Sequence, residues 1–129
     1  MTMIAGLFFA AVNVVYAAMF GGPIDGTSWD LKVKQDGLFH WSSQSDTLVF
    51  ERGRAVIAGE IAKGYEPAPY DAKVEDGTTS FSLVLAGDGR DAAEWTGRVR
   101  GDAVSGSVVV RGGDGSTRRF TFSGSRKTG

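Results

Sequence analysis

The sequence contains no cysteine among its 129 residues and only one histidine, His40. The first absence excludes disulfide bonds, thiolate nucleophiles and cysteine-ligated metal sites. The second excludes a zinc site built from several histidines. His40 has Asp36 and Asp46 nearby in sequence, but we interpret it as an exposed loop histidine, not as a lone acid or base.

The charge pattern excludes several further classes of function. The formal net charge is −1 with both signs interspersed, so there is no basic surface for nucleic acid. The acidic residues do not follow the spacing of a calcium loop, and the glycine-rich stretches do not lie between a strand and a helix as a phosphate loop requires. We therefore expect a protein that is not an enzyme, with no catalytic residues, no metal and no cofactor.

The first 24 residues carry no charged side chain. Ile4 to Ala17 has the length of an export-signal core, and Val15 and Ala17 occupy the small-residue positions of a cleavage site. We expect a signal peptide over residues 1–17, a mature domain over residues 18–129, and a periplasmic or extracellular protein with no membrane association after cleavage. A membrane anchor over Thr2 to Phe20 and an ordered part of the fold are the alternatives.

From Gly26 onward, hydrophobic and polar residues alternate, and no stretch has helical periodicity. The pattern predicts eight strands joined by short connections, which makes sequence neighbours antiparallel. The third of these strands is expected to run from Ala55 to Ile61. The residues expected to face inward on successive strands are Trp29, Leu31 and Val33; Leu48 and Phe50; Ala55, Ile57, Gly59 and Ile61; Tyr70, Ala72 and Val74; Phe81, Leu83 and Leu85; Trp95, Gly97 and Val99; Val104, Gly106, Val108 and Val110; and Phe120, Phe122 and Gly124.

Eight strands with one apolar face remove their exposed edges best by closing on themselves. We therefore predict an all-β fold, an eight-stranded antiparallel up-and-down β-barrel, as a monomer. An open two-sheet sandwich is the alternative that the same alternation allows. Four inward glycines are expected where strands coil tightly, namely Gly59, Gly97, Gly106 and Gly124.

Arg100-Gly101-Asp102 is the tripeptide that cell-adhesion receptors recognise. It lies between two alternating runs, and a Gly-Asp pair in that position is typical of a tight hairpin turn. We interpret the tripeptide as the turn between the sixth and seventh strands.

The segment around Gly26 and Trp29 resembles the lipocalin-like (calycin) barrels, which begin with a glycine and a tryptophan where the first strand enters the barrel. In that family a basic residue near the last strand covers the tryptophan, and Arg126 matches it here. The pattern from Trp95 to Gly106 also resembles small exported bacterial lipocalin-like proteins of undefined function. The resemblance implies an eight-stranded barrel with space for a ligand or a filled interior.

Two connections, residues 35–46 and 63–70, are irregular and rich in aromatic residues. Loops at the mouth of a barrel commonly carry recognition. We expect a compact apolar or amphipathic ligand to bind there, and the alternative is a packed barrel that binds a protein partner or acts as an inhibitor through its surface. The expected ligand-binding residues are Phe39, Trp41, Tyr65, Tyr70 and Trp95.

Overall fold

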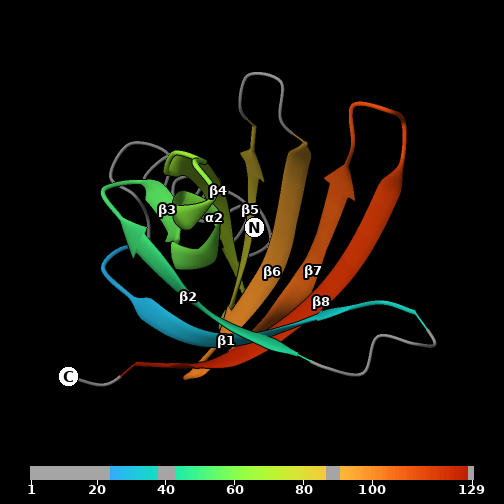
Figure 1. Cartoon of the computed structure of the whole chain (residues 1–129). Helices are drawn as coiled ribbons and strands as arrows, with labels where there is room; N and C mark the ends of the chain where they lie inside the picture. The colour runs from blue at the N-terminus through green and yellow to red at the C-terminus, as the bar shows by residue number, and fades with distance from the viewer. Residues whose placement is uncertain (1–23, 38–42, 87–90, 128–129) are drawn as a thin grey trace, which may run out of the picture.

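The computed structural model describes residues 24–37, 43–86 and 91–127, so the expected signal peptide over residues 1–17 lies outside the described part. Eight antiparallel strands form a closed barrel in which each strand pairs with its sequence neighbours and the last pairs with the first (Figure 1). The predicted up-and-down barrel is confirmed. The strands are β1 (Ser28–Gln35), β2 (Gln44–Glu51), β3 (Arg54–Ile57), β4 (Ala68–Glu75), β5 (Thr78–Leu85), β6 (Ala92–Arg100), β7 (Ala103–Arg111) and β8 (Thr117–Arg126).

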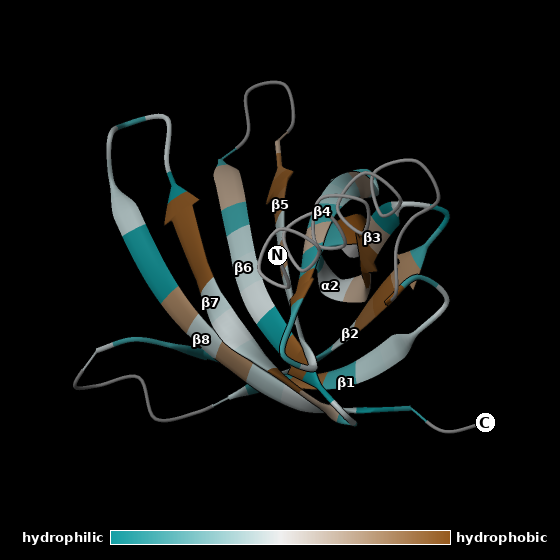
Figure 2. Ribbon diagram, turned by 180° about the vertical axis from the view of Figure 1, so that it is seen from behind, coloured by the Kyte–Doolittle hydropathy of each residue, from teal (hydrophilic) through white to brown (hydrophobic). Residues whose placement is uncertain are grey.

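The alternation in the sequence becomes an inside and an outside of the barrel. Along β6, every second residue from Ala93 to Val99 is buried, and the residues between them are exposed. Figure 2 shows the same change between hydrophobic and hydrophilic residues along the strands. Because successive side chains of a strand point to opposite faces, this pattern sends one set to the core and the other to water.

Two glycines on neighbouring strands make room for aromatic rings inside the barrel. Gly97 of β6 lies opposite Gly106 of β7 in the register. A Cβ atom on Gly97 would lie 2.5 Å from Cζ of Phe81, and one on Gly106 would lie 2.6 Å from Cζ of Phe122. The rings therefore occupy the space that side chains at these two positions would need. The sequence predicted these inward glycines at places where strands coil tightly, and the structure shows that they leave room for aromatic rings.

The third strand is shorter than predicted and is followed by a helix that the sequence pattern did not indicate. β3 ends at Ile57, and α2 (Ala58–Ala62) follows it beside β2 and β3 (Figure 1). Gly59 and Ile61 therefore lie on a helix, and Ile61 is exposed. Among the described residues, no helix has the length and apolar character needed to cross a membrane.

Contacts from β2 explain why a helix forms here. Ile57 precedes the helix and has no side-chain oxygen to cap it. Asp46 of β2 supplies the carboxylate instead, and its Oδ1 accepts a hydrogen bond from the Gly59 amide at 2.8 Å. A Cβ on Gly59 would lie 2.6 Å from Oδ2 of Asp46, so glycine permits the close approach of the carboxylate. This tertiary contact does not follow from local periodicity.

The pairing of β3 with β4 is the shortest in the barrel. Only Arg54 with Pro69 and Ala55 with Ala68 are in register. Pro69 has no backbone N–H to donate, which agrees with the expected irregularity of this connection. α2 and the chain that follows it fill the place that a longer third strand would take.

The Arg-Gly-Asp tripeptide lies at a hairpin, as predicted. Arg100 pairs with Ala103, which leaves Gly101 and Asp102 as a two-residue turn between β6 and β7. Gly101 has φ of 59°, the left-handed conformation that a tight hairpin needs at this position. In the turn between β4 and β5, both residues, Asp76 and Gly77, have positive φ.

Replacing Gly106 with alanine tests whether the Phe122 ring needs the space that this glycine leaves free. The new methyl group would collide with Phe122 and with the backbone of β6, so we expect Gly106→Ala to lower the free energy of unfolding by about 1–3 kcal/mol. Gly113→Ala is the matched control, because a Cβ there meets no atom within 4 Å. Urea unfolding followed by circular dichroism measures the stability of both variants. Equal stability would show that the barrel has room for a side chain at Gly106.

Candidate functional site

A cavity of about 420 Å³ lies at the end of the barrel where α2 is found. Its walls come from the C-terminal part of strand β1, the first residues of β2, and the residues from Gly59 to Tyr65. The adjoining ends of β6, β7 and β8 complete them. We call it the mouth cavity. It is lined by Val33, Gln44, Ser45, Asp46, Gly59, Glu60, Lys63, Tyr65, Asp91, Trp95, Val108, Val110, Arg118 and Phe120.

The mouth cavity has an apolar wall and a charged rim. Val108 and Val110 of β7 and Phe120 of β8 have inward parity and supply apolar surface. Charged side chains stand around them on β2, α2 and the start of β6 and β8. An apolar concave surface with a few polar groups is typical of sites for small molecules, and 420 Å³ lies in their usual range of about 300–1,000 Å³.

The charges of the rim are paired with one another. Arg118 Nη2 lies 2.9 Å from Oδ2 of Asp91, and Lys63 Nζ lies 3.3 Å from Oε1 of Glu60. The Tyr65 hydroxyl donates a hydrogen bond to the backbone oxygen of Asp91 at 2.6 Å. The lining residues thus include three carboxylates and two cations, and each cation has a carboxylate partner.

Trp95 combines burial with an unsatisfied donor. It lines the mouth cavity and is 3% exposed. Its indole Nε1 has no hydrogen-bond partner among the residues that the structure describes. Leaving a buried donor unpaired costs about 1–3 kcal/mol, so native structures rarely keep one without a reason. The ring packs against Phe122, with centroids 5.2 Å apart.

The rest of the interior is filled. A row of aromatic rings crosses it from Tyr70 through Phe50 to Phe81, with centroid separations of 4.7 and 4.9 Å. Phe122 and Trp95 continue the row. An eight-stranded barrel can be filled by its own side chains or can hold one small ligand. This barrel is packed through its centre, and the mouth cavity is the space left at one end.

The structure brings some of the predicted site residues together. Tyr65 and Trp95 both line the mouth cavity. Phe39 and Trp41 lie outside the described residues, as does His40, and their part in the site stays a prediction. Tyr70 does not line the mouth cavity, and its hydroxyl donates a hydrogen bond to Asp25 at 3.0 Å.

Asp25 holds the start of the barrel to the β2–β3 turn. Its carboxylate accepts hydrogen bonds from the amides of Arg52 at 3.0 Å and Gly53 at 2.9 Å. Both turn residues have positive φ, and Arg52 is not a glycine, so this conformation is disfavoured without support. The carboxylate and the Tyr70 hydroxyl give the turn that support. Tyr70 thus helps to hold the β2–β3 turn in place.

The charged residues of the rim are those that sequence reasoning missed. Most charged residues of a folded protein lie on its solvated surface, so there was no general reason in the sequence to assign them to a cavity. Arg118 shares inward parity with Phe120 and Phe122 on β8, and this alternation was the signal that could have assigned Arg118 to the cavity. No signal of that kind existed for Lys63 or Asp91, which come from connections whose course is set by the fold.

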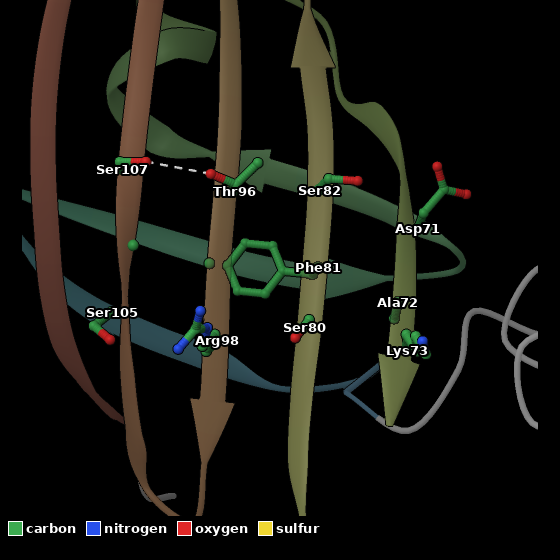
Figure 3. Close-up of a pocket in the computed structure, with 12 residues that line it drawn as sticks. Asp71, Ala72, Lys73, Ser80, Phe81, Ser82, Thr96, Arg98, Ser105 and Ser107 are labelled. Atoms are coloured by element: carbon green, nitrogen blue, oxygen red, sulfur yellow. Dashed lines mark hydrogen bonds between the residues drawn. The ribbon is translucent and has the colours of Figure 1, made fainter. Parts of the chain in front are cut away.

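A wider and more open groove lies on the outer face of β4–β7 (Figure 3). It measures about 700 Å³, and exposed hydroxyl and charged side chains line it, among them Ser80, Thr96 and Arg98. The glycine pair Gly97 and Gly106 forms part of its floor. Its polar side chains are already solvated, so it offers a ligand less desolvation of apolar surface than the mouth cavity does.

Neither a metal site among the described residues nor a similar protein points to a function for this chain. Among residues 24–37, 43–86 and 91–127, no three acidic or histidine side chains gather as a metal site would require. Comparison with protein families, with curated proteins and with solved structures finds no match for this chain. The geometry of the cavity therefore carries the functional argument.

The Tyr70–Asp25 contact predicts how stability depends on pH. Burial, together with the hydrogen bond to Asp25 and its charge, raises the pKa of Tyr70 above its usual value of about 10. The folded protein therefore keeps this proton at a pH where the unfolded chain has lost it. The stability that the contact provides is fully present below about pH 10 and is lost as pH rises further.

We therefore expect the stability difference between the wild type and Tyr70→Phe to shrink above about pH 10. Urea unfolding of both proteins across the alkaline range measures it, and the common titration of lysines cancels in the difference. A difference that stays constant with pH would show that Tyr70 does not hold its proton more tightly in the folded state.

Proposed function

We propose that this protein is a small binding barrel whose mouth cavity holds a compact amphipathic ligand. The observation that carries the proposal is the contrast within one interior: the centre is filled by aromatic rings, while one end keeps 420 Å³ of space with an apolar wall. An apolar concave surface of this size can bury much of a small molecule, which favours binding at this end of the barrel.

The wall and the rim suggest how such a ligand lies. Its apolar part would lie against Val108, Val110 and Phe120, where burial of apolar surface gives about 25 cal/mol per Å². Its polar part would lie near the rim, where charged and hydroxyl groups remain in contact with water.

We also propose a relationship to the lipocalin-like barrels, beyond the shared eight-stranded architecture. Trp29 is fully buried at the start of β1, and Arg126 of β8 lies directly opposite it in the register. The indole N–H of Trp29 donates a hydrogen bond to Thr27 at 2.9 Å, which fixes the ring at the entrance to the first strand. Export to the periplasm or beyond remains a prediction from the first 17 residues.

A pair of variants on adjacent residues tests the cavity. Val110 lines the mouth cavity, and its neighbour Val109 has outward parity. We expect Val110→Trp to fill the space and to weaken binding of butylbenzene at least about tenfold, while Val109→Trp leaves it unchanged. Ligand-observed NMR titration with butylbenzene as the probe measures both.

Mass spectrometry of solvent extracts from the protein purified from its native host addresses the natural ligand. A small amphipathic molecule recovered with the wild type and with Val109→Trp, but not with Val110→Trp, supports the proposal. Equal binding of butylbenzene by all three folded proteins would overturn it, because the probe would then lie elsewhere.

A further inference from the structure

The apolar wall of the mouth cavity does not by itself require a tryptophan at position 95. A phenylalanine or leucine at this position would supply apolar surface without a donor. The indole of Trp95 instead carries an N–H group that is buried and has no hydrogen-bond partner among the described residues. By contrast, the indole N–H of Trp29 has Thr27 Oγ1 at 2.9 Å.

We infer that the ligand of the mouth cavity carries an uncharged oxygen acceptor, of the kind found in a ketone, ester or amide carbonyl, which accepts a hydrogen bond from Nε1 of Trp95. This inference rests on the proposed binding function and specifies the chemical class of the ligand. The indole nitrogen is a donor only, so the group that satisfies it must be an acceptor.

The position of the indole fits this role. Trp95 lies on β6 between Leu83 of β5 and Val108 of β7 in the register, and Val108 also lines the cavity. The nitrogen itself has almost no accessible area. A ligand would therefore reach the N–H only after the ring or its neighbours move slightly.

The charges of the rim favour an uncharged acceptor over a carboxylate. Lys63 and Arg118 are the two cations that line the cavity, and they are engaged with Glu60 and Asp91. Asp46 adds a further negative charge to the lining, and its carboxylate accepts the Gly59 amide. A ligand carboxylate would therefore lose its hydration without gaining a cation of its own, which is unfavourable.

A weaker partner for the N–H is the face of Phe122. The two rings lie 5.2 Å apart at 43°, and an N–H···π contact of this kind is a second-order interaction. If that contact satisfied the indole, a ligand oxygen would gain nothing from Trp95. The two cases differ in whether a carbonyl improves binding.

Three probes of similar shape separate these cases. Butyrophenone carries a carbonyl, butylbenzene has no acceptor, and phenylbutyrate carries a carboxylate. We expect butyrophenone to bind the wild type about tenfold more tightly than butylbenzene, and phenylbutyrate to bind more weakly than butyrophenone. We also expect butyrophenone, but not butylbenzene, to shift the indole N–H resonance of Trp95 in a ¹H–¹⁵N spectrum.

Trp95→Phe removes the donor and keeps an aromatic ring. In this variant we expect the preference for butyrophenone over butylbenzene to disappear while butylbenzene still binds. Thr96→Val is the matched control, because Thr96 is the adjacent residue on the outer face of the same strand. It should keep the full preference. The indole resonance in the wild type provides the same test if Trp95→Phe does not fold.

Each outcome has a distinct meaning. Equal affinity for butyrophenone and butylbenzene in the wild type, with no selective shift of the indole signal, overturns the inference and leaves the binding function standing. Tighter binding of phenylbutyrate also overturns it, because the ligand would then be an anion. Failure of all three probes to bind counts against the proposed function itself, and the inference falls with it.

Discussion

The structure depends on the contact of two phenylalanine rings with two glycines. Phe81 and Phe122 lie where side chains on Gly97 and Gly106 would otherwise extend, and the backbone of β6 and β7 comes close to the rings. This contact leaves room for five large aromatic residues in the centre of the barrel. Packing at this density tolerates little change in volume, so the two glycines and two rings act as one unit.

The mouth cavity remains open because the aromatic rings that fill the centre of the barrel do not extend to that end. The aromatic row ends at Trp95, and the wall beyond it is built from valines and Phe120, which are too small or too peripheral to close the end. α2 lies across this end because β3 stops at Ile57, and it brings Glu60 and Lys63 to the rim. The same short third strand thus weakens the pairing with β4 and forms one side of the cavity.

Buried polar groups in the described part of the chain are mostly satisfied by partners close in space. Trp29 donates to Thr27, Tyr70 donates to Asp25, and Asp46 accepts from the start of α2. Each of these contacts also fixes an element in place, since they hold the first strand, the β2–β3 turn and the helix. Trp95 departs from this pattern beside the mouth cavity, and the hydrogen bond to a ligand oxygen that we infer would satisfy its N–H.

The sequence by itself determined the eight strands, their antiparallel order, the inward residues other than Gly59 and Ile61, and the hairpin at Arg100-Gly101-Asp102, because these follow from alternation and turn chemistry within a few residues. It also singled out Tyr65 and Trp95, which both line the mouth cavity. Tertiary structure alone decided the helix after Ile57, which depends on a carboxylate 13 residues away in the chain. It likewise decided that Tyr70 would pair with Asp25, and that Arg118 and Asp91 would meet at the rim, because these contacts join segments whose separation in sequence carries no local signal.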